Sequence, residues 1–209
     1  MTKPATTRRM SGPNRRRQIL DVAVEAFAAR GYAGTSMREI AAAAGVTKPV
    51  LYLHFASKDR LYVALLEEIS GALTRQSEDA MAAETPPRER VRAAIAAFFA
   101  YAEERPAAVR VLLAGGLGDA ELERESARIQ RAVTARLRDL LAAEPGLWAG
   151  IPDRELRLEM VVEFTKTGLH GLAHWWSTNP KVNRETLVDA VMALVWDGLA
   201  EGFEVRSRG

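Results

Sequence analysis

The densest group of side chains able to form directional hydrogen bonds lies in the segment TKPVLYLHFASK, at residues 47–58. Lys48, Tyr52 and His54 stand close together there, and side chains of these types bind phosphate oxygens or base edges. The segment is too short and polar for a core helix, and it is too aromatic for an ordinary solvent loop. We therefore expect it to form a surface that contacts another molecule.

A second group of chemical interest contains His170 and His174, which are four residues apart. On a helix they share a face with Glu163 and Thr167, and this spacing is compatible with metal ligation. The sequence offers no identifiable third ligand, and no glutamate lies between the two histidines as in the zinc hydrolase pattern. Three interpretations stay open: core or interface side chains, polar anchors for an organic ligand, and metal ligands.

Sequence patterns typical of enzymes are missing. The segment AGGLGD, at residues 114–119, lacks the lysine and the length of a phosphate-binding loop. The chain has no cysteine, which excludes a cysteine nucleophile, disulfides and thiolate metal sites. No set of serine, histidine and acidic residues has a suggestive spacing. We expect a protein that is not an enzyme and that uses no cofactor.

The hydropathy pattern predicts a chain without a membrane partner. No apolar run approaches the roughly 20 residues that a membrane span needs. The basic N-terminal segment is not followed by the apolar stretch of a signal peptide. Because cysteine is also absent, we expect a cytoplasmic location.

Charge is distributed unevenly along the 209 residues. Residues 1–60 hold 11 Lys and Arg against 4 Asp and Glu, a net charge of +7, whereas residues 61–209 hold 18 against 23, a net charge of −5. This asymmetry favours a polyanionic partner for the N-terminal part. A solvated basic tail is the alternative, since seven of the eleven basic residues precede residue 31.

The elements that must position these groups are all helical. Apolar residues recur at three- and four-residue steps, and no convincing alternation of period two is present. Gly31 suits a helix end, Ser36 with Glu39 forms a capping box, and Thr47 and Ser57 are expected N-caps. The expected helices cover residues 14–30, 36–44, 47–55, 57–83, 88–104, a short segment opened by Pro106, 121–143, 154–177 and 184–204. The sequence therefore predicts an all-α fold of nine helices.

Two of the short helices form a candidate helix-turn-helix. Ala41 allows the helices to approach, Gly45 supplies the turn four residues later, and Leu51 follows six residues after that as a core residue. In such a unit the second helix enters the major groove with its N-terminal residues toward the base edges. One side of residues 47–55 would then pack on the core while the other side meets DNA.

This N-terminal region resembles a known family. The motif YLHFASK, the helix-ending Gly31 and the aromatic Tyr32 all lie within RRRQILDVAVEAFAARGYAGTSMREIAAAAGVTKPVLYLHFASKDRLY. Over about residues 14–65 the chain resembles the DNA-binding region of the TetR family of transcriptional regulators. Pro49 stands where that family more often has glycine.

The resemblance implies three parts of the chain: a flexible basic arm at residues 1–13, a helix-turn-helix DNA-binding domain at 14–56, and a helical domain for ligand binding and dimerisation at 57–209. Arg8 and Arg9 of the arm would follow the minor groove. The DNA contacts that it implies are Ser36, Thr47, Lys48, Pro49, Tyr52, His54 and Lys58.

The roles of these side chains follow partly from chemistry and partly from the resemblance. Lys48 would reach a guanine or a phosphate, and Pro49 a thymine methyl. The resemblance implies phosphate contacts for Tyr52, His54 and Lys58. For Tyr52 and His54 a purely structural role, packing between the third and fourth helices, stays open. Double-stranded DNA with a palindromic operator is the expected partner.

The C-terminal body is expected to form a homodimer through its eighth and ninth helices. The segments 154–177 and 184–204 are apolar nearly all round, so both sides of each helix must be covered. Leu194 and Gly198 lie on one such face, and Leu199 and Phe203 on another. In the family the two helices pack against their mates as a four-helix bundle.

The body also carries candidates for a small-molecule site. They are aromatic side chains and polar groups at helical spacing, although aromatic residues at such spacing usually belong to a core. The candidates are Phe98, Tyr101, Phe164, Thr167, His170, His174 and Trp175. The expected function is a repressor released from its operator by a small apolar effector. The alternatives are a DNA-binding protein without an effector and a metal-responsive regulator that uses His170 and His174.

Overall fold

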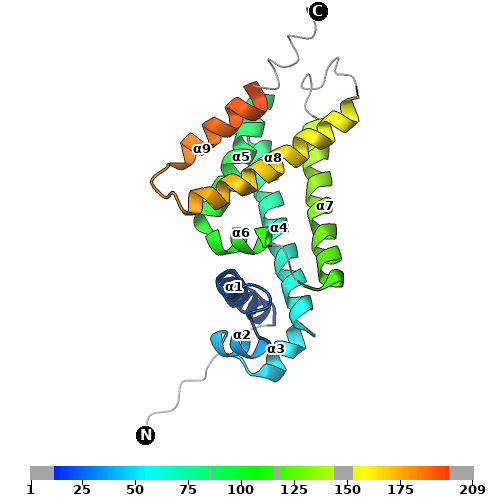
Figure 1. The fold of residues 1–209 in the computed structure, drawn as a ribbon, viewed down its shortest axis with the longest axis vertical. Helices are drawn as coiled ribbons and strands as arrows, with labels where there is room; N and C mark the ends of the chain where they lie inside the picture. The colour runs from blue at the N-terminus through cyan, green and yellow to red at the C-terminus, as the bar shows by residue number, and fades with distance from the viewer. Residues whose placement is uncertain (1–11, 85, 115–117, 144–152, 198–209) are drawn as a thin grey trace, which may run out of the picture. The chain divides into compact units, whose positions relative to one another are not determined.

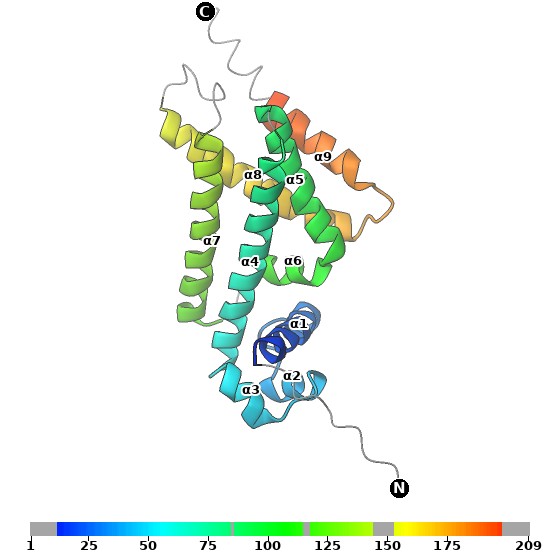
Figure 2. The same cartoon turned by 180° about the vertical axis from the view of Figure 1, so that it is seen from behind.

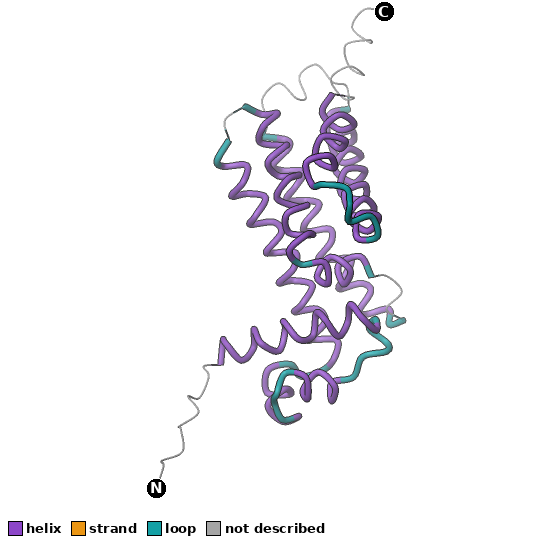
Figure 3. The backbone as a smooth tube through the Cα atoms, turned by 90° about the vertical axis from the view of Figure 1, so that its left-hand side faces the viewer, coloured by secondary structure: helices purple, strands orange, loops and turns teal. Residues whose placement is uncertain are grey.

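The computed structural model describes residues 12–84, 86–114, 118–143 and 153–197. Within these residues the chain forms nine α-helices and no strand (Figure 3), which confirms the predicted all-α fold. The chain divides into two compact units, Met1–Leu65 and Leu66–Gly209. The division falls inside α4 (Lys58–Ala82), so one continuous helix belongs in part to each unit.

The first unit contains α1 (Gly12–Arg30), α2 (Met37–Ala43), α3 (Lys48–His54) and the start of α4 (Figure 1). Gly31 ends α1 in the left-handed region, with φ of 69°, where glycine has no steric penalty. The core of this unit consists of aliphatic side chains that are almost completely inaccessible: Ile19, Leu20, Ile40, Leu51 and Leu61.

Three aromatic rings extend this core. The Phe27 ring contacts the Tyr62 ring edge-on at 5.0 Å, and Tyr32 meets Tyr62 at 5.2 Å. Edge-to-face contacts of this kind stabilise a fold beyond their buried area. They hold the end of α1, the loop after it and the start of α4 together, so the helix-turn-helix has a rigid base.

The second unit holds the rest of α4 with α5 (Pro87–Glu104), α6 (Pro106–Leu113), α7 (Ala120–Ala142), α8 (Arg154–Ser177) and α9 (Arg184–Met192). α8 packs on α5, α6 and α7, and α9 packs on α5 (Figure 2). Its core includes Phe99, Val111, Val162, Val188 and Met192. Arg92 of α5 also binds Asp189 of α9 at 2.8 Å and Glu185 of the same helix.

Side-chain caps define several helix starts of this unit. Asp119 accepts hydrogen bonds from the amides of Glu121 and Leu122 at the start of α7, and Asn183 accepts one from Thr186 at the start of α9. The ninth helix was expected to continue to residue 204. In the structure its α-helical part ends at Met192 and a π-helical turn, Ala193–Asp197, follows. Gly198, Leu199 and Phe203 lie outside the described residues.

No helix in the described part of the chain combines the length and apolar character that a membrane crossing requires.

Candidate DNA-binding surface and ligand cavity

The start of α2 is fixed by a reciprocal pair of hydrogen bonds. The Ser36 hydroxyl accepts from the Glu39 amide at 3.3 Å, and the Glu39 carboxylate accepts from the Ser36 amide at 2.9 Å. This is the predicted capping box, which satisfies two amides without a helical partner. The Ser36 hydroxyl and then the Ser36 amide hold the pKa of Glu39 below its ordinary value, so the carboxylate stays ionised and the cap persists.

The turn between α2 and α3 depends on Gly45. Its φ is 61°, a left-handed conformation that side chains rarely adopt. The amide of Val46 donates back to the carbonyl of Ala41 at 2.9 Å. Gln18 of α1 donates to the carbonyl of Ala44 at 3.0 Å, which ties the turn to the first helix. The predicted helix-turn-helix therefore forms, with a buried Ala41 between its helices.

The N-terminus of α3 differs in one detail from the expectation. Thr47 occupies the N-cap position, yet its side chain makes no capping hydrogen bond. An N-cap side chain accepts from the second or third helical amide, and the second position here is Pro49, which has no amide hydrogen. Pro49 thus removes one of the two amides that Thr47 could cap, and the exposed Thr47 side chain makes no capping bond to the other, that of Val50.

The outer side of α3 is exposed. Thr47, Lys48, Pro49 and Tyr52 are all exposed, and the ammonium of Lys48 lies 5.7 Å from the centroid of the Tyr52 ring. Leu53 is 82% exposed, although it was not among the predicted contacts. Its position one residue after Tyr52, on the side opposite the buried Leu51 and Phe55, was the signal that could have revealed it.

Lys58 makes contacts within the first unit rather than projecting freely. Its ammonium donates to the backbone carbonyls of Tyr32 and Thr35 at 2.9 and 3.1 Å, and it lies 4.1 Å from the Tyr32 ring centroid. This geometry differs from the expected phosphate contact, because the charge is directed at the loop before α2. His54 is half-buried at the end of α3. Arg8 and Arg9 lie outside the described residues.

The second unit contains a partly open cavity of about 120 Å³. Side chains from α4, α5, α7 and α8 form most of its wall, and most of them are apolar. They include Leu73 and Met81 of α4, Ile95 and Phe98 of α5, Leu137 and Leu141 of α7, and Val162 and Leu169 of α8. Such a wall suits a hydrocarbon group.

Two of the seven predicted ligand residues, Phe98 and His170, line this cavity, and their rings lie 5.8 Å apart. Tyr101 is buried but does not line it. The other four predicted residues, Phe164, Thr167, His174 and Trp175, are exposed on α8. The sequence could not separate the two faces of α8, since both carry large apolar side chains.

His170 and His174 do not face the same space. His170 lines the cavity, whereas His174 lines a separate groove near the α8–α9 connection. In the described part of the chain no three acidic, histidine or cysteine side chains are grouped to hold a metal ion. The four-residue spacing therefore does not bring a complete set of metal ligands together there.

The cavity wall contains a few polar groups of distinct character. The buried hydroxyls of Ser70 in α4 and Thr165 in α8 have no hydrogen-bond partner. Burial lowers the pKa of His170 to about 4, and the charge of Lys166 acts in the same direction, so the imidazole is neutral near pH 7. Lys166 itself donates to Thr134 and Glu163 at 2.7 and 2.9 Å.

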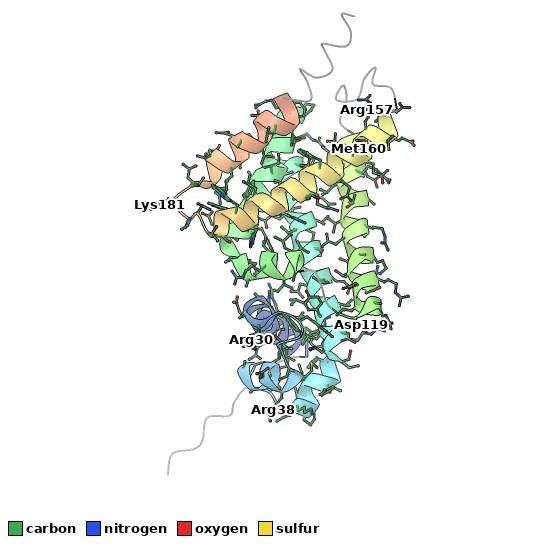
Figure 4. All side chains as sticks on the ribbon, viewed as in Figure 1. Arg30, Arg38, Asp119, Arg157, Met160 and Lys181 are labelled. Atoms are coloured by element: carbon green, nitrogen blue, oxygen red, sulfur yellow. The ribbon has the colours of Figure 1, made fainter. Side chains whose placement is uncertain are left out.

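Away from the cavity, α8 presents an exposed apolar stripe at helical spacing. It consists of Leu156, Met160, Phe164 and Trp175, which are between 46% and 69% exposed; Met160 projects from α8 in Figure 4. Leu194, in the π-helical turn after α9, is 71% exposed. An apolar stripe of this size on one helix is typical of an interaction surface.

Comparison with known proteins identifies the class to which this fold and helix-turn-helix belong. Residues 19–65 match the family model described as "Bacterial regulatory proteins, tetR family". The transcriptional activator FasR of Mycolicibacterium smegmatis is 30% identical over 194 residues, covering 92% of this chain and 86% of that protein. The chain belongs to the TetR family of DNA-binding transcriptional regulators.

Two solved structures show how far the fold is shared. A TetR-like regulator from Rhodococcus sp. RHA1 superposes with a TM-score of 0.73 at 26% identity, covering 92% of this chain and 99% of that one. FadR from Bacillus subtilis, in complex with stearoyl-CoA, gives a TM-score of 0.70 at 23% identity over 86% of this chain and 96% of the other.

Proposed function

We propose that the protein is a dimeric transcriptional repressor that binds a palindromic operator and is released from it by an apolar ligand held in the α4–α8 cavity. DNA binding is assigned to the helix-turn-helix of the first unit. Ligand binding and dimerisation are assigned to the second unit. The observation that carries this proposal is α4, whose start is bonded to the helix-turn-helix loop through Lys58 and whose later turns line the cavity.

The DNA-binding surface in this proposal is the exposed side of α3 with the N-terminus of α2. Lys48 would reach a guanine or a phosphate, Tyr52 a phosphate, and Pro49 and Leu53 thymine methyl groups. The Thr47 side chain makes no capping bond, so its hydroxyl can bond a base edge or a phosphate. Ser36 presents a capped helix N-terminus, which favours an anion. His54, at the end of α3, would contact a phosphate.

Lys58 has a different role in this proposal from the one that the sequence suggested. Its two bonds to backbone carbonyls position the loop before α2, and the ammonium adds positive charge close to the surface that meets DNA. It is therefore a positioning residue for the helix-turn-helix, and direct phosphate contacts are left to Lys48 and Tyr52.

The dimer would form through the apolar stripe of α8 together with Leu194. A second copy of the chain is the partner that fits, because a two-fold operator requires two identical readers. Phe164 and Trp175, expected from sequence to bind a ligand, would then contact the partner subunit. Gly168 and Gly171 lie along the same helix, and a Cβ added at either would meet no atom within 4 Å, so two such helices can approach closely.

The ligand would be a molecule with a hydrocarbon part and one polar group. The wall is mainly aliphatic, with Phe98 and a neutral His170 as its aromatic members. The cavity of about 120 Å³ is smaller than the roughly 300–1,000 Å³ typical of ligand sites. A ligand of that size would therefore have to widen it, and α4 forms part of the wall that would have to move. The stearoyl-CoA complex of FadR from Bacillus subtilis concerns a protein of the same fold.

The proposal is tested by measuring operator affinity with and without ligand. An operator is first selected from random duplexes with the purified full-length protein. Fluorescence anisotropy should then show dimer binding that medium-chain and long-chain apolar compounds weaken. Tight operator binding that no compound of this class alters, together with no thermal stabilisation by any of them, would contradict the ligand-controlled part. Failure to select any duplex would contradict the DNA-binding part.

A further inference from the structure

We infer that the cavity selects a ligand whose buried polar group is uncharged, such as an ester, thioester, amide, ketone or alcohol, and rejects free carboxylates and amines. This inference rests on the proposed ligand-binding function and specifies the chemistry of that same site. It follows from which polar groups of the wall are already bonded and which are not.

Among the described polar groups of the wall, the hydroxyls of Ser70 and Thr165 are the ones that are buried without a hydrogen-bond partner. Both are buried, both belong to the cavity wall, and neither has a hydrogen-bond partner in the structure. A buried hydroxyl without a partner is disfavoured, and it is a rare feature of folded proteins. Since the two residues come from α4 and α8, one ligand atom or group between them would connect the helix that reaches the DNA-binding unit with the helix that carries the apolar stripe.

A third wall hydroxyl provides the contrast. Thr74, one helical turn after Ser70, donates to the carbonyl of Ser70 at 2.9 Å. Its proton is therefore used within α4. The presence of a satisfied threonine beside an unsatisfied serine in the same wall shows that the local helix geometry does not by itself leave hydroxyls unpaired.

The charged group of the wall is not available to a ligand carboxylate. Lys166 is only 14% exposed, and its ammonium is bonded to the Glu163 carboxylate and to the Thr134 hydroxyl. Its charge is already balanced by Glu163, so pairing with a ligand anion would compete with an existing ion pair whose lysine is largely removed from water. No described residue that lines the cavity is an aspartate or a glutamate, so an ammonium group has no partner either.

His170 completes the argument, because it is half-buried beside Phe98 and in its neutral form near pH 7. A neutral imidazole offers one donor and one acceptor, and each hydroxyl does the same. These groups match a carbonyl or an alcohol. Burying a charge among them would cost more than a neutral group, since no counter-ion is free.

The test compares four compounds with the same alkyl chain: the methyl ester, the primary alcohol, the carboxylate and the primary amine. Binding to the full-length protein is measured at pH 7.5 by calorimetry, below the micelle concentration of each compound. The ester and the alcohol should bind at least about tenfold more tightly than the two ions, which corresponds to about 1.4 kcal/mol. Equal or tighter binding of the carboxylate would overturn the inference and leave the ligand-responsive function intact.

Variants of the wall locate the polar contact. Ser70→Ala and Thr165→Val should each weaken binding of the ester or the alcohol roughly two- to twelvefold, the net worth of one hydrogen bond. Thr74→Val, the matched control, should change it less than about twofold. Circular dichroism melts of the free variants show that they remain folded. Unchanged ester affinity in both Ser70→Ala and Thr165→Val would overturn the assignment of these hydroxyls.

Lys166→Met tests the competing explanation, in which a ligand carboxylate pairs with Lys166. If a carboxylate binds to the wild type and loses its affinity in this variant, Lys166 exchanges Glu163 for the ligand and the inference is wrong. If none of the four compounds binds at any chain length, the ligand-binding function itself fails with it, and the operator measurements remain as a separate test of DNA binding.

Discussion

At the scale of single residues, the first unit depends on a lysine that points inward to backbone carbonyls. Lys58 bonds the carbonyls of Tyr32 and Thr35, and hydrogen bonds from a charged donor are each worth about 1.5–3 kcal/mol. Lys58→Met should lower the free energy of unfolding by about 2–4 kcal/mol, measured by urea denaturation. Arg60→Met, at an exposed neighbouring position, should change it by less than about 0.5 kcal/mol.

The DNA-binding proposal is most sharply tested at Lys48. Because this side chain is exposed at the N-terminus of α3, its loss should leave folding intact. Lys48→Ala should weaken operator binding by about 1–3 kcal/mol, or roughly 5- to 150-fold, if it contacts a base. Arg131→Ala, an exposed cation of α7, is the control and should have little effect. Equal losses for the operator and for random DNA would assign Lys48 to phosphate instead.

His170 makes stability depend on pH in a defined window. Its pKa is lowered from 6.5 to about 4 in the folded protein, so the unfolded chain binds more protons between these two values. The free energy of unfolding should therefore fall as pH falls from about 6.5 to 4, by up to about 3 kcal/mol from this residue. His170→Gln should flatten the profile in that window and leave its shape above pH 7.5 unchanged, as followed by thermal denaturation.

At the scale of elements, the exposure of the α8 stripe favours a dimer contact over a ligand contact for its aromatic residues. Phe164 is 69% exposed in the single chain, and a dimer would bury it. Phe164→Glu places an uncompensated charge in that interface and should raise the dimer dissociation constant at least about a hundredfold. Sedimentation velocity measures this, with Ala132→Glu on the exposed side of α7 as the control. An unaltered dimer would show that another surface is used.

Much of the element-level picture was predictable because it follows from local rules. The capping box of Ser36 and Glu39, the left-handed Gly31 and Gly45, and the Ser57 cap of α4 are all present. Local rules did not predict the N-cap of α3, where Thr47 makes no side-chain capping bond and Pro49 removes one of the two amides that it could have capped. They also failed for α8, because a helix that is apolar on several sides does not reveal which side faces a cavity and which is exposed.

The polar contacts of the second unit could not be read from the sequence for a related reason. Ser70 and Thr165 are ordinary helix residues in composition, and they become notable only because α4 and α8 place both hydroxyls in one wall without partners. Lys58 resembled a phosphate ligand by its motif position. The carbonyls that it binds come from residues 23 and 26 positions earlier in the chain, and no periodic pattern predicts such contacts.

At the scale of the whole molecule, ligand and DNA should influence each other by equal factors. If the ligand weakens operator binding 5- to 150-fold, a coupling of about 1–3 kcal/mol, saturating operator DNA must weaken ligand binding by the same factor. Calorimetric titration of the ligand into free protein and into the protein–operator complex measures the second factor, and operator affinity with and without ligand measures the first. Unequal factors would mean that another equilibrium, such as dimer dissociation, contributes to the response.

The position of the unit boundary inside α4 has a consequence for exchanging parts between proteins of this family. A junction in the loop before Ser57 would separate the helix-turn-helix from Lys58, Leu61 and Tyr62, which complete its core. A junction after Leu65 keeps these residues with their partners. The segment that forms the cavity wall, which begins at Ser70 in this chain, would then come entirely from the second protein, the donor. A hybrid regulator should therefore be joined in mid-helix, with the donor's residues kept in the same helical phase, so that a new sensor acquires this operator specificity intact.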